Sequence, residues 1–186
     1  MAEITYKEVV ILISLLWVST RIFWAIRKRG IDFKHEIRLI LVYICFIVIA
    51  RIVYFPLGLK DGHIGVLHFD IERMYPFRIN SNPIEHMFDI YSGWLINIVG
   101  NVMMFIPVGI VWPYCFKKLD RVWKVTLAGF GLSLFIEITQ LPFYERCSDI
   151  DDLIMNTSGA LIGAIIFFVT RWIKRRSKDI KNDQQR

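Results

Sequence analysis

The chain has 186 residues, and 55% of them are hydrophobic, whereas a soluble domain usually has about 45–50%. The apolar residues are concentrated in blocks close to the roughly 20 residues that a helix needs to cross a bilayer. The net charge of +6 comes mostly from lysines and arginines that flank these blocks, without a motif that reads nucleic acid. The composition therefore predicts an integral membrane protein and argues against nucleic-acid binding.

The apolar blocks predict an all-α membrane bundle of about five spanning helices, with one longer extracellular segment between the second and the third. The spans are expected at about residues 7–26, 37–57, 94–116, 122–142 and 152–172. The first block lacks the preceding basic region of a signal peptide, so it is interpreted as a retained span. Residues 1–186 are expected to form a single membrane domain that ends in a basic cytoplasmic tail, residues 173–186.

The charges of the connecting segments predict how the chain is oriented in the membrane. Lysine and arginine are frequent in residues 27–38, in residues 117–124 and after the last span, and they are sparse in residues 58–93 and 143–151. Because basic loops face the cytoplasm, the N-terminus is expected outside and the C-terminus inside. Arg21 and Arg51 lie within spans but near their ends, where their long side chains can reach the inner and the outer membrane surface.

The predicted extracellular segment carries weak structural signals. Alternating apolar residues across Gly65–Ile71 indicate either a short hairpin or a re-entrant interfacial segment. Asn80-Ser81-Asn82-Pro83 predicts a turn, and Pro83 is expected to begin a short helix that runs to Tyr91. No metal site or cofactor is predicted, because neither the cysteines nor the histidines of the predicted extracellular segment have a ligand spacing. These residues are Cys45, Cys115, Cys147, His63, His68 and His86.

The third to fifth predicted spans carry polar residues at positions where a membrane helix should be apolar, which costs a few kcal/mol unless the groups are paired or hydrated. From the helical rise, Asn97 and Asn101 lie about 5 and 10 Å below the outer end of their span. Glu137 and Asn156 each lie about 6 Å below the outer ends of theirs. This common depth predicts one outward-opening pocket. Its candidate residues are Asn97, Asn101, Glu137, Gln140, Arg146, Asp149, Asp152 and Asn156.

The spacing of these residues also predicts shared helix faces and close helix packing. Asn97 and Asn101 are four residues apart and share one face. The sequence Gly159-x-x-x-Gly163 continues the stripe of Asp152 and Asn156, and such glycine pairs allow a neighbouring backbone to approach closely. The residues expected to shape the packing are Gly100, Pro107, Gly109, Gly159 and Gly163, and Pro107 is expected to kink its helix because it removes a hydrogen bond.

The residue types limit the chemistry of the predicted pocket. The carboxylates offer acid–base groups or oxygen ligands, Arg146 can hold a carboxylate or phosphate, and the amides can bind sugars, amides or headgroups. A serine or cysteine nucleophile is not predicted, because no histidine accompanies one on these stripes. A purely structural interpretation stays open, in which the amides join helices and Glu137 pairs with Arg146.

Three motifs together resemble the VanZ-like family, small bacterial membrane proteins named for a glycopeptide-resistance accessory protein. They are Asn97-x-x-Gly100-Asn101-x-x-x-Phe105-x-Pro107-x-Gly109, Glu137-x-x-Gln140, and Arg146-x-x-Asp149-x-x-Asp152-x-x-x-Asn156-x-x-Gly159-x-x-x-Gly163. The resemblance covers about residues 75–170, and Met74-Tyr75-Pro76-Phe77 is similar to the family's short Pro-Phe element. It implies a bacterial plasma membrane location and, for the namesake, lower susceptibility to teicoplanin, but no reaction.

Three functions are consistent with these observations. In the first, the outer pocket binds a membrane lipid, a lipid-linked cell-wall precursor or a glycopeptide-related ligand, and thereby lowers glycopeptide susceptibility. In the second, the protein is an enzyme acting on a lipid headgroup or cell-wall precursor, with Glu137 and Asp152 as acid–base groups or metal ligands. In the third it transports a lipid or small solute, although the sequence shows no symmetrical pair of broken helices. The sequence does not indicate an oligomeric state.

Overall fold

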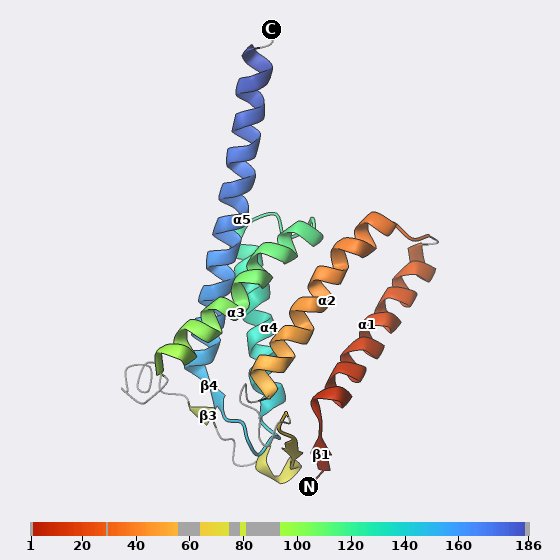
Figure 1. Cartoon of the computed structure of the whole chain (residues 1–186), viewed down its shortest axis with the longest axis vertical. Helices are drawn as coiled ribbons and strands as arrows, with labels where there is room; N and C mark the ends of the chain where they lie inside the picture. Colours follow the sequence, from red (N-terminus) through yellow and green to blue (C-terminus); the bar gives the residue numbers. More distant parts are fainter. Residues whose placement is uncertain (1, 29, 56–63, 75–78, 81–93, 185–186) are drawn as a thin grey trace. The chain divides into compact units, whose positions relative to one another are not determined.

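A computed structural model describes residues 2–28, 30–55, 64–74, 79–80 and 94–184. The described chain contains five long helices (Figure 1), α1 (Tyr6–Lys28), α2 (Phe33–Tyr54), α3 (Trp94–Cys115), α4 (Val122–Gln140) and α5 (Ile150–Gln184). Each is long and apolar enough to cross a membrane, which confirms the prediction of an all-helical membrane protein with five spans. Helix α2 ends before the predicted residue 57, and α5 continues past the predicted residue 172.

Short elements precede the first helix or lie between later helices. They are β1 (Ala2–Ile4), β2 (Leu67–Phe69), the 3-10 helix η1 (Ile71–Met74), β3 (Ile79–Asn80) and β4 (Ser148–Asp149). Strand β2 lies where a hairpin or re-entrant segment was predicted, and it pairs antiparallel with β1. Strands β3 and β4 pair in parallel. The predicted turn beyond Asn80, the predicted helix of residues 83–91 and the Pro-Phe element at residues 75–77 lie outside the described residues.

The chain forms two compact units. Unit 1 comprises Met1–Pro83 and Phe135–Ile150, and unit 2 comprises Ile84–Leu134 and Asp151–Arg186. Both α4 and α5 therefore contribute residues to each unit. The expectation of a single membrane domain over the whole chain stays a prediction.

In unit 1, local side-chain contacts determine where the first two helices begin. Thr5 and Glu8 form a reciprocal cap at the start of α1, with the Thr5 N–H donating to Glu8 Oε2 at 2.7 Å and the Glu8 N–H donating to Thr5 Oγ1 at 3.4 Å. At the start of α2, Asp32 Oδ1 accepts from the His35 N–H at 3.2 Å. These contacts satisfy backbone donors that have no partner within the helix.

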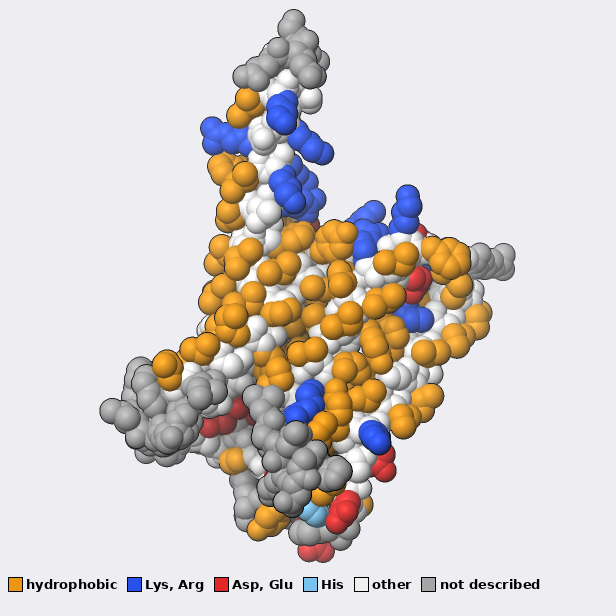
Figure 2. Space-filling view, viewed as in Figure 1, with side chains coloured by type: hydrophobic (Ala, Val, Ile, Leu, Met, Phe, Trp, Pro, Cys, Tyr) orange, Lys and Arg blue, Asp and Glu red, His pale blue; other side chains and the backbone are white. Residues whose placement is uncertain are grey.

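Helices α1 and α2 run antiparallel beside each other (Figure 1). Ser14 Oγ and Tyr43 OH form a hydrogen bond of 2.7 Å between them, and Trp17 packs against Tyr43. No side chain of α1 is buried, and Figure 2 shows apolar side chains over much of the visible surface of both helices. Such a surface suits contact with lipid rather than water.

In unit 2, α3 approaches α5 so closely that only glycine fits at several positions. A Cβ atom added to Gly159 would lie 2.1 Å from Val102 O, and one added to Gly163 would lie 2.2 Å from Ile106 O. Gly109 lies in the same seam, where its Cβ would be 2.2 Å from Ala160 O. Gly100 differs, because a Cβ there would meet nothing within 4 Å among the described residues. The geometry therefore supports the predicted packing role for three of the four glycines, but gives none to Gly100.

Helix α5 is much longer than a membrane span. Its 35 residues extend about 50 Å, whereas the hydrocarbon core of a bilayer is about 30 Å thick. Figure 2 shows lysine and arginine side chains gathered along its C-terminal part. The basic tail predicted from the sequence is thus a continuation of the fifth helix up to Gln184.

Candidate functional site

The eight predicted pocket residues are divided between the two units. Glu137, Gln140, Arg146 and Asp149 belong to unit 1, and Asn97, Asn101, Asp152 and Asn156 belong to unit 2. Contacts within each unit bring together part of the set. The expectation that all eight line one pocket stays a prediction.

Glu137 lies near the end of α4 and holds the segment that precedes α5. Its side chain is buried, with 5% of the residue exposed. Oε2 accepts hydrogen bonds from Ser148 Oγ at 3.1 Å and from the Asp149 backbone N–H at 2.9 Å. Two donors on one carboxylate oxygen offset the cost of burying a charge. This geometry brings Glu137 and Asp149 together through the Glu137 carboxylate and the Asp149 backbone N–H.

Gln140 and Arg146 bind the C-terminal end of α2. The contacts with successive carbonyls are Gln140 Nε2 to Val53 O at 3.2 Å, Arg146 Nε to Tyr54 O at 3.0 Å, and Arg51 Nη1 to Phe55 O at 3.1 Å. The last carbonyls of a helix have no partner within the helix, and positive side chains are favourable near this end. Both predicted site residues therefore have a structural role as partners of α2, and Arg51 also binds a carbonyl at this end of the helix.

The segment between α4 and α5 is also attached to the described parts of the predicted extracellular segment. The Asp70 N–H donates to Pro142 O at 2.9 Å, and the Tyr144 N–H donates to His68 O at 3.0 Å. Asn80 Nδ2 donates to Asp149 Oδ2 at 3.2 Å, beside the pairing of β3 with β4. These contacts determine where Asp149 stands in unit 1.

His68 joins this segment through Glu145. The His68 N–H donates to Glu145 Oε2 at 3.0 Å, and the His68 ring contacts the other carboxylate oxygen. Burial works against ionisation of Glu145, but the hydrogen bonds from His68 outweigh it and hold the pKa of this carboxyl below its ordinary value. Within the described residues, no three His, Cys, Asp or Glu side chains are arranged to hold a metal ion.

In unit 2, Asn97, Asn101 and Asp152 form a connected set that we call the amide–carboxylate group. Asn101 Nδ2 donates to Asp152 Oδ1 at 2.6 Å and lies 3.4 Å from Asn97 Oδ1. Asn97 is exposed, and the other two residues are half-buried. Asn97 Nδ2 and Asn101 Oδ1 form no hydrogen bond within the described chain. The group can therefore offer both a donor and an acceptor to a ligand.

Asn156 is placed differently, in a buried contact between α4 and α5. Its Nδ2 donates to Ser133 Oγ at 3.0 Å, and the two residues are 2% and 0% exposed. Asn156 Oδ1 has no hydrogen-bond partner among the described residues. Reversing the amide would leave its nitrogen unsatisfied instead. The position favours a helix-joining role for Asn156.

Three hydrogen-bond partners of the predicted site residues, Ser133, Ser148 and Asn80, were not predicted as site residues from the sequence. Ser133 has a recognisable signal, because Gly129, Ser133 and Glu137 recur at intervals of four residues along one face of α4. Ser148 and Asn80 have no comparable local signal. Their role depends on which distant segments meet in the folded chain.

Comparison with known proteins adds one finding. The model of the VanZ/LLP1 family matches residues 10–171, a range that includes all eight predicted pocket residues and the glycine seam. No curated protein and no solved structure matches the chain significantly.

Proposed function

Since the chain belongs to the VanZ/LLP1 family, we propose that it is a bacterial plasma-membrane protein that lowers susceptibility to glycopeptide antibiotics such as teicoplanin. The match confirms the VanZ-like resemblance seen in the motifs. In the proposed action, the protein binds a lipid-linked cell-wall precursor at the outer membrane surface and changes the target that the antibiotic meets. The five apolar helices support the membrane location.

The amide–carboxylate group of Asn97, Asn101 and Asp152 is the observation that carries this proposal. It lies at the ends of α3 and α5 that the loop charges predict to face outward, and Asn97 is exposed. Amide and carboxylate groups suit the hydroxyl, amide and amine groups of a sugar–peptide headgroup. Gln140 and Arg146, by contrast, already donate to carbonyls of α2. The proposal therefore assigns ligand recognition to the amide–carboxylate group.

Two substitutions test this assignment in a glycopeptide-susceptible bacterium that expresses the chain. Asn101→Ala removes the donor shared by Asn97 and Asp152, and Asp152→Asn replaces a charged acceptor. Each variant is expected to lose the increase in the minimal inhibitory concentration of teicoplanin that the wild type produces. Immunoblots of the membranes must show equal amounts of protein. Asn182→Ala, at an exposed position of the tail, is the matched control and should behave as wild type.

The proposal has two parts, binding of a precursor and lower teicoplanin susceptibility. Binding of the purified protein to a lipid-linked peptidoglycan precursor in nanodiscs tests the first part separately from the second. Wild type is expected to bind the precursor, and Asn101→Ala to bind it more weakly. Full resistance in both variants would show that the amide–carboxylate group is not the site. A wild type without any effect on teicoplanin susceptibility would overturn the resistance function itself.

Glu137→Gln is expected to affect folding rather than ligand recognition. It weakens the charge-assisted contacts with Ser148 and Asp149, so we expect less folded protein in the membrane. The enzyme and transporter alternatives stay predictions, because no contact among the described residues favours either one over ligand binding.

A further inference from the structure

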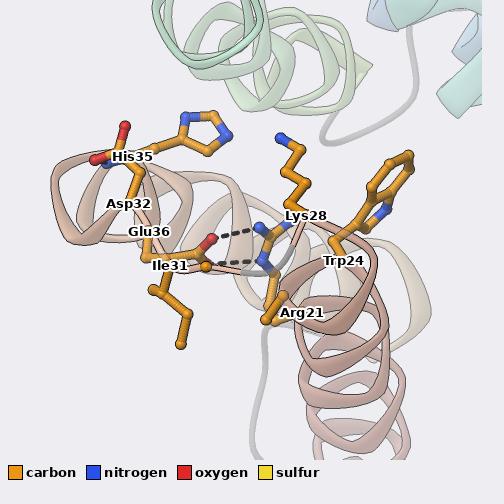
Figure 3. Close-up of a pocket in the computed structure, with 9 residues that line it drawn as sticks. Arg21, Trp24, Lys28, Ile31, Asp32, His35 and Glu36 are labelled. Carbon is orange, nitrogen blue, oxygen red and sulfur yellow. Dashed lines mark hydrogen bonds and ion pairs between the residues drawn. The ribbon is translucent and has the colours of Figure 1, made fainter.

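A pocket of about 290 Å³ lies at the turn from α1 to α2, and the proposed function does not use it (Figure 3). Its polar and aromatic lining consists of Arg21, Trp24, Lys28, Asp32, His35 and Glu36. Most of its lining residues belong to the basic linker of residues 27–38, which the positive-inside rule predicts to face the cytoplasm. It is therefore expected at the inner membrane surface.

Both acidic side chains of the pocket are bound by other groups of unit 1. Arg21 Nε donates to Glu36 Oε2 at 2.8 Å, and Arg21 Nη2 pairs with Glu36 Oε1, as the dashed lines in Figure 3 show. Asp32 Oδ1 accepts from the His35 N–H at the start of α2. The guanidinium of Arg21 is thus balanced by Glu36, and Asp32 serves the helix end.

Lys28 and His35 bring further hydrogen-bonding groups to the same opening. In Figure 3 the Lys28 amine and the His35 ring extend toward one another, the first from α1 and the second from α2. A lysine ammonium and an imidazole N–H can donate to the oxygens of one anion. The α2 N-terminus beside them adds a partial positive charge that also favours an anion.

Apolar surface beside these donors points to a lipid rather than a free anion. Trp24 is 43% exposed, and Lys28 Nζ lies 5.8 Å from the centre of its ring. Ile31, which also lines the pocket, is exposed as well. Tryptophan and lysine together are typical of the membrane interface, where an apolar ring meets the acyl ester region and a cation meets the phosphate.

We propose that this pocket binds the phosphodiester of an inner-leaflet phospholipid. The phosphate oxygens accept hydrogen bonds from Lys28 and His35, and the glycerol region lies against Trp24. The pocket volume is at the low end of the range for small-molecule sites, which suits a headgroup whose acyl chains remain in the bilayer. The bound lipid would hold the α1–α2 turn at the inner membrane surface.

Titration of phosphatidylglycerol into the delipidated full-length protein in detergent, followed by native mass spectrometry, tests the proposal. Lys28→Gln is expected to weaken binding about tenfold, the size of effect that loss of one charged hydrogen bond produces. Lys34→Gln is the matched control, because it removes the same charge from the same linker at an exposed residue outside the pocket lining. Equal affinities of the two variants would overturn the proposal.

Two further ligands identify the source of the phosphate. Diacylglycerol, which lacks the phosphate, should bind weakly and equally to both variants. Inorganic phosphate should leave the bound phosphatidylglycerol in place, whereas full displacement at equal concentration would indicate a free-anion site and contradict the lipid assignment. Circular dichroism checks the fold of each variant. If Lys28→Gln loses helix content, His35→Gln takes its place, and unchanged lipid affinity in that variant would reject the proposal.

Discussion

Polar side chains near the ends of the apolar helices bind other groups of the protein. Glu137 accepts from donors ahead of α5, and Gln140 and Arg146 donate to carbonyls at the end of α2. Unpaired backbone groups at membrane depth cost several kcal/mol each, because no water satisfies them. These contacts give all three residues a structural role, whereas the pairing of Glu137 with Arg146 stays a prediction. The amides of Asn97, which is exposed, and Asn101, which is half-buried, are better suited to a ligand.

The buried contact between Ser133 and Asn156 leads to a test by a double substitution. Ser133→Ala leaves the Asn156 amide without its partner and is expected to lower the free energy of unfolding by about 0.6–1.7 kcal/mol. Adding Asn156→Leu should recover part of this loss, because both polar groups are then gone. Unfolding in detergent measures the effect. Ser158→Ala, whose hydroxyl bonds within α5, is the control, and an equal loss there would contradict the assignment.

The contact between Glu145 and His68 predicts a dependence of stability on pH. Because the pKa of Glu145 in the folded protein lies below the ordinary 4.5, its ionised form stabilises the fold above that pH. The contribution is lost as the pH falls below 4.5 and through the lower pKa. Glu145→Gln should therefore melt below wild type at neutral pH, with a difference that shrinks in acid. Glu72→Gln, at an exposed residue, should show no such trend.

At the scale of elements, local sequence signals define the helices, and side-chain volume defines how they pack. Thr5 and Glu8 cap α1, and Asp32 caps α2, each within four residues of the helix start. The approach of α3 to α5 depends on Gly159 and Gly163, where a β-carbon has no room. Membrane helices often pack through small residues, because lipid is as apolar as the side chains and the hydrophobic effect therefore does not bring the helices together.

Alanine substitutions of the glycines distinguish the effect of close helix packing on stability from the effect of helix propensity. Gly159→Ala places a methyl group 2.1 Å from Val102 O, and we expect destabilisation of about 1–3 kcal/mol. Gly100→Ala meets nothing within 4 Å among the described residues and gains up to about 1 kcal/mol of helix propensity. Thermal melting in detergent compares the two variants. A seam that tolerated Gly159→Ala as well as Gly100→Ala would show that α3 and α5 do not approach as described.

At the scale of the whole molecule, five apolar helices and the alternation of basic loops predict an N-terminus outside and a C-terminus in the cytoplasm. This orientation assigns the amide–carboxylate group to the outer surface and the Lys28 pocket to the inner surface. The two proposed ligands would then meet the protein from opposite leaflets. Both proposals therefore depend on the same topology.

Cys147 provides a direct test of that topology. It is exposed in the segment predicted to lie outside, whereas Cys45 and Cys115 are buried. A membrane-impermeant maleimide should label intact cells that express wild type and should fail to label Cys147→Ser. Labelling that requires cell lysis would reverse the orientation and remove the basis for an outer ligand site.

The sequence alone determined the five helices, the family and the helix faces of Asn97, Asn101, Glu137 and Gln140, because apolar block length and helical spacing are local properties. Only the tertiary structure decided what these side chains bind. Gln140 and Arg146 find carbonyl partners 87 and 92 residues away. Within the part of the chain that the structure describes, a Cβ at Gly100 would meet nothing within 4 Å, whereas one at Gly159 would collide with a backbone carbonyl. Hydrogen-bond partners and free volume depend on which distant segments meet, and local sequence patterns do not predict these long-range contacts.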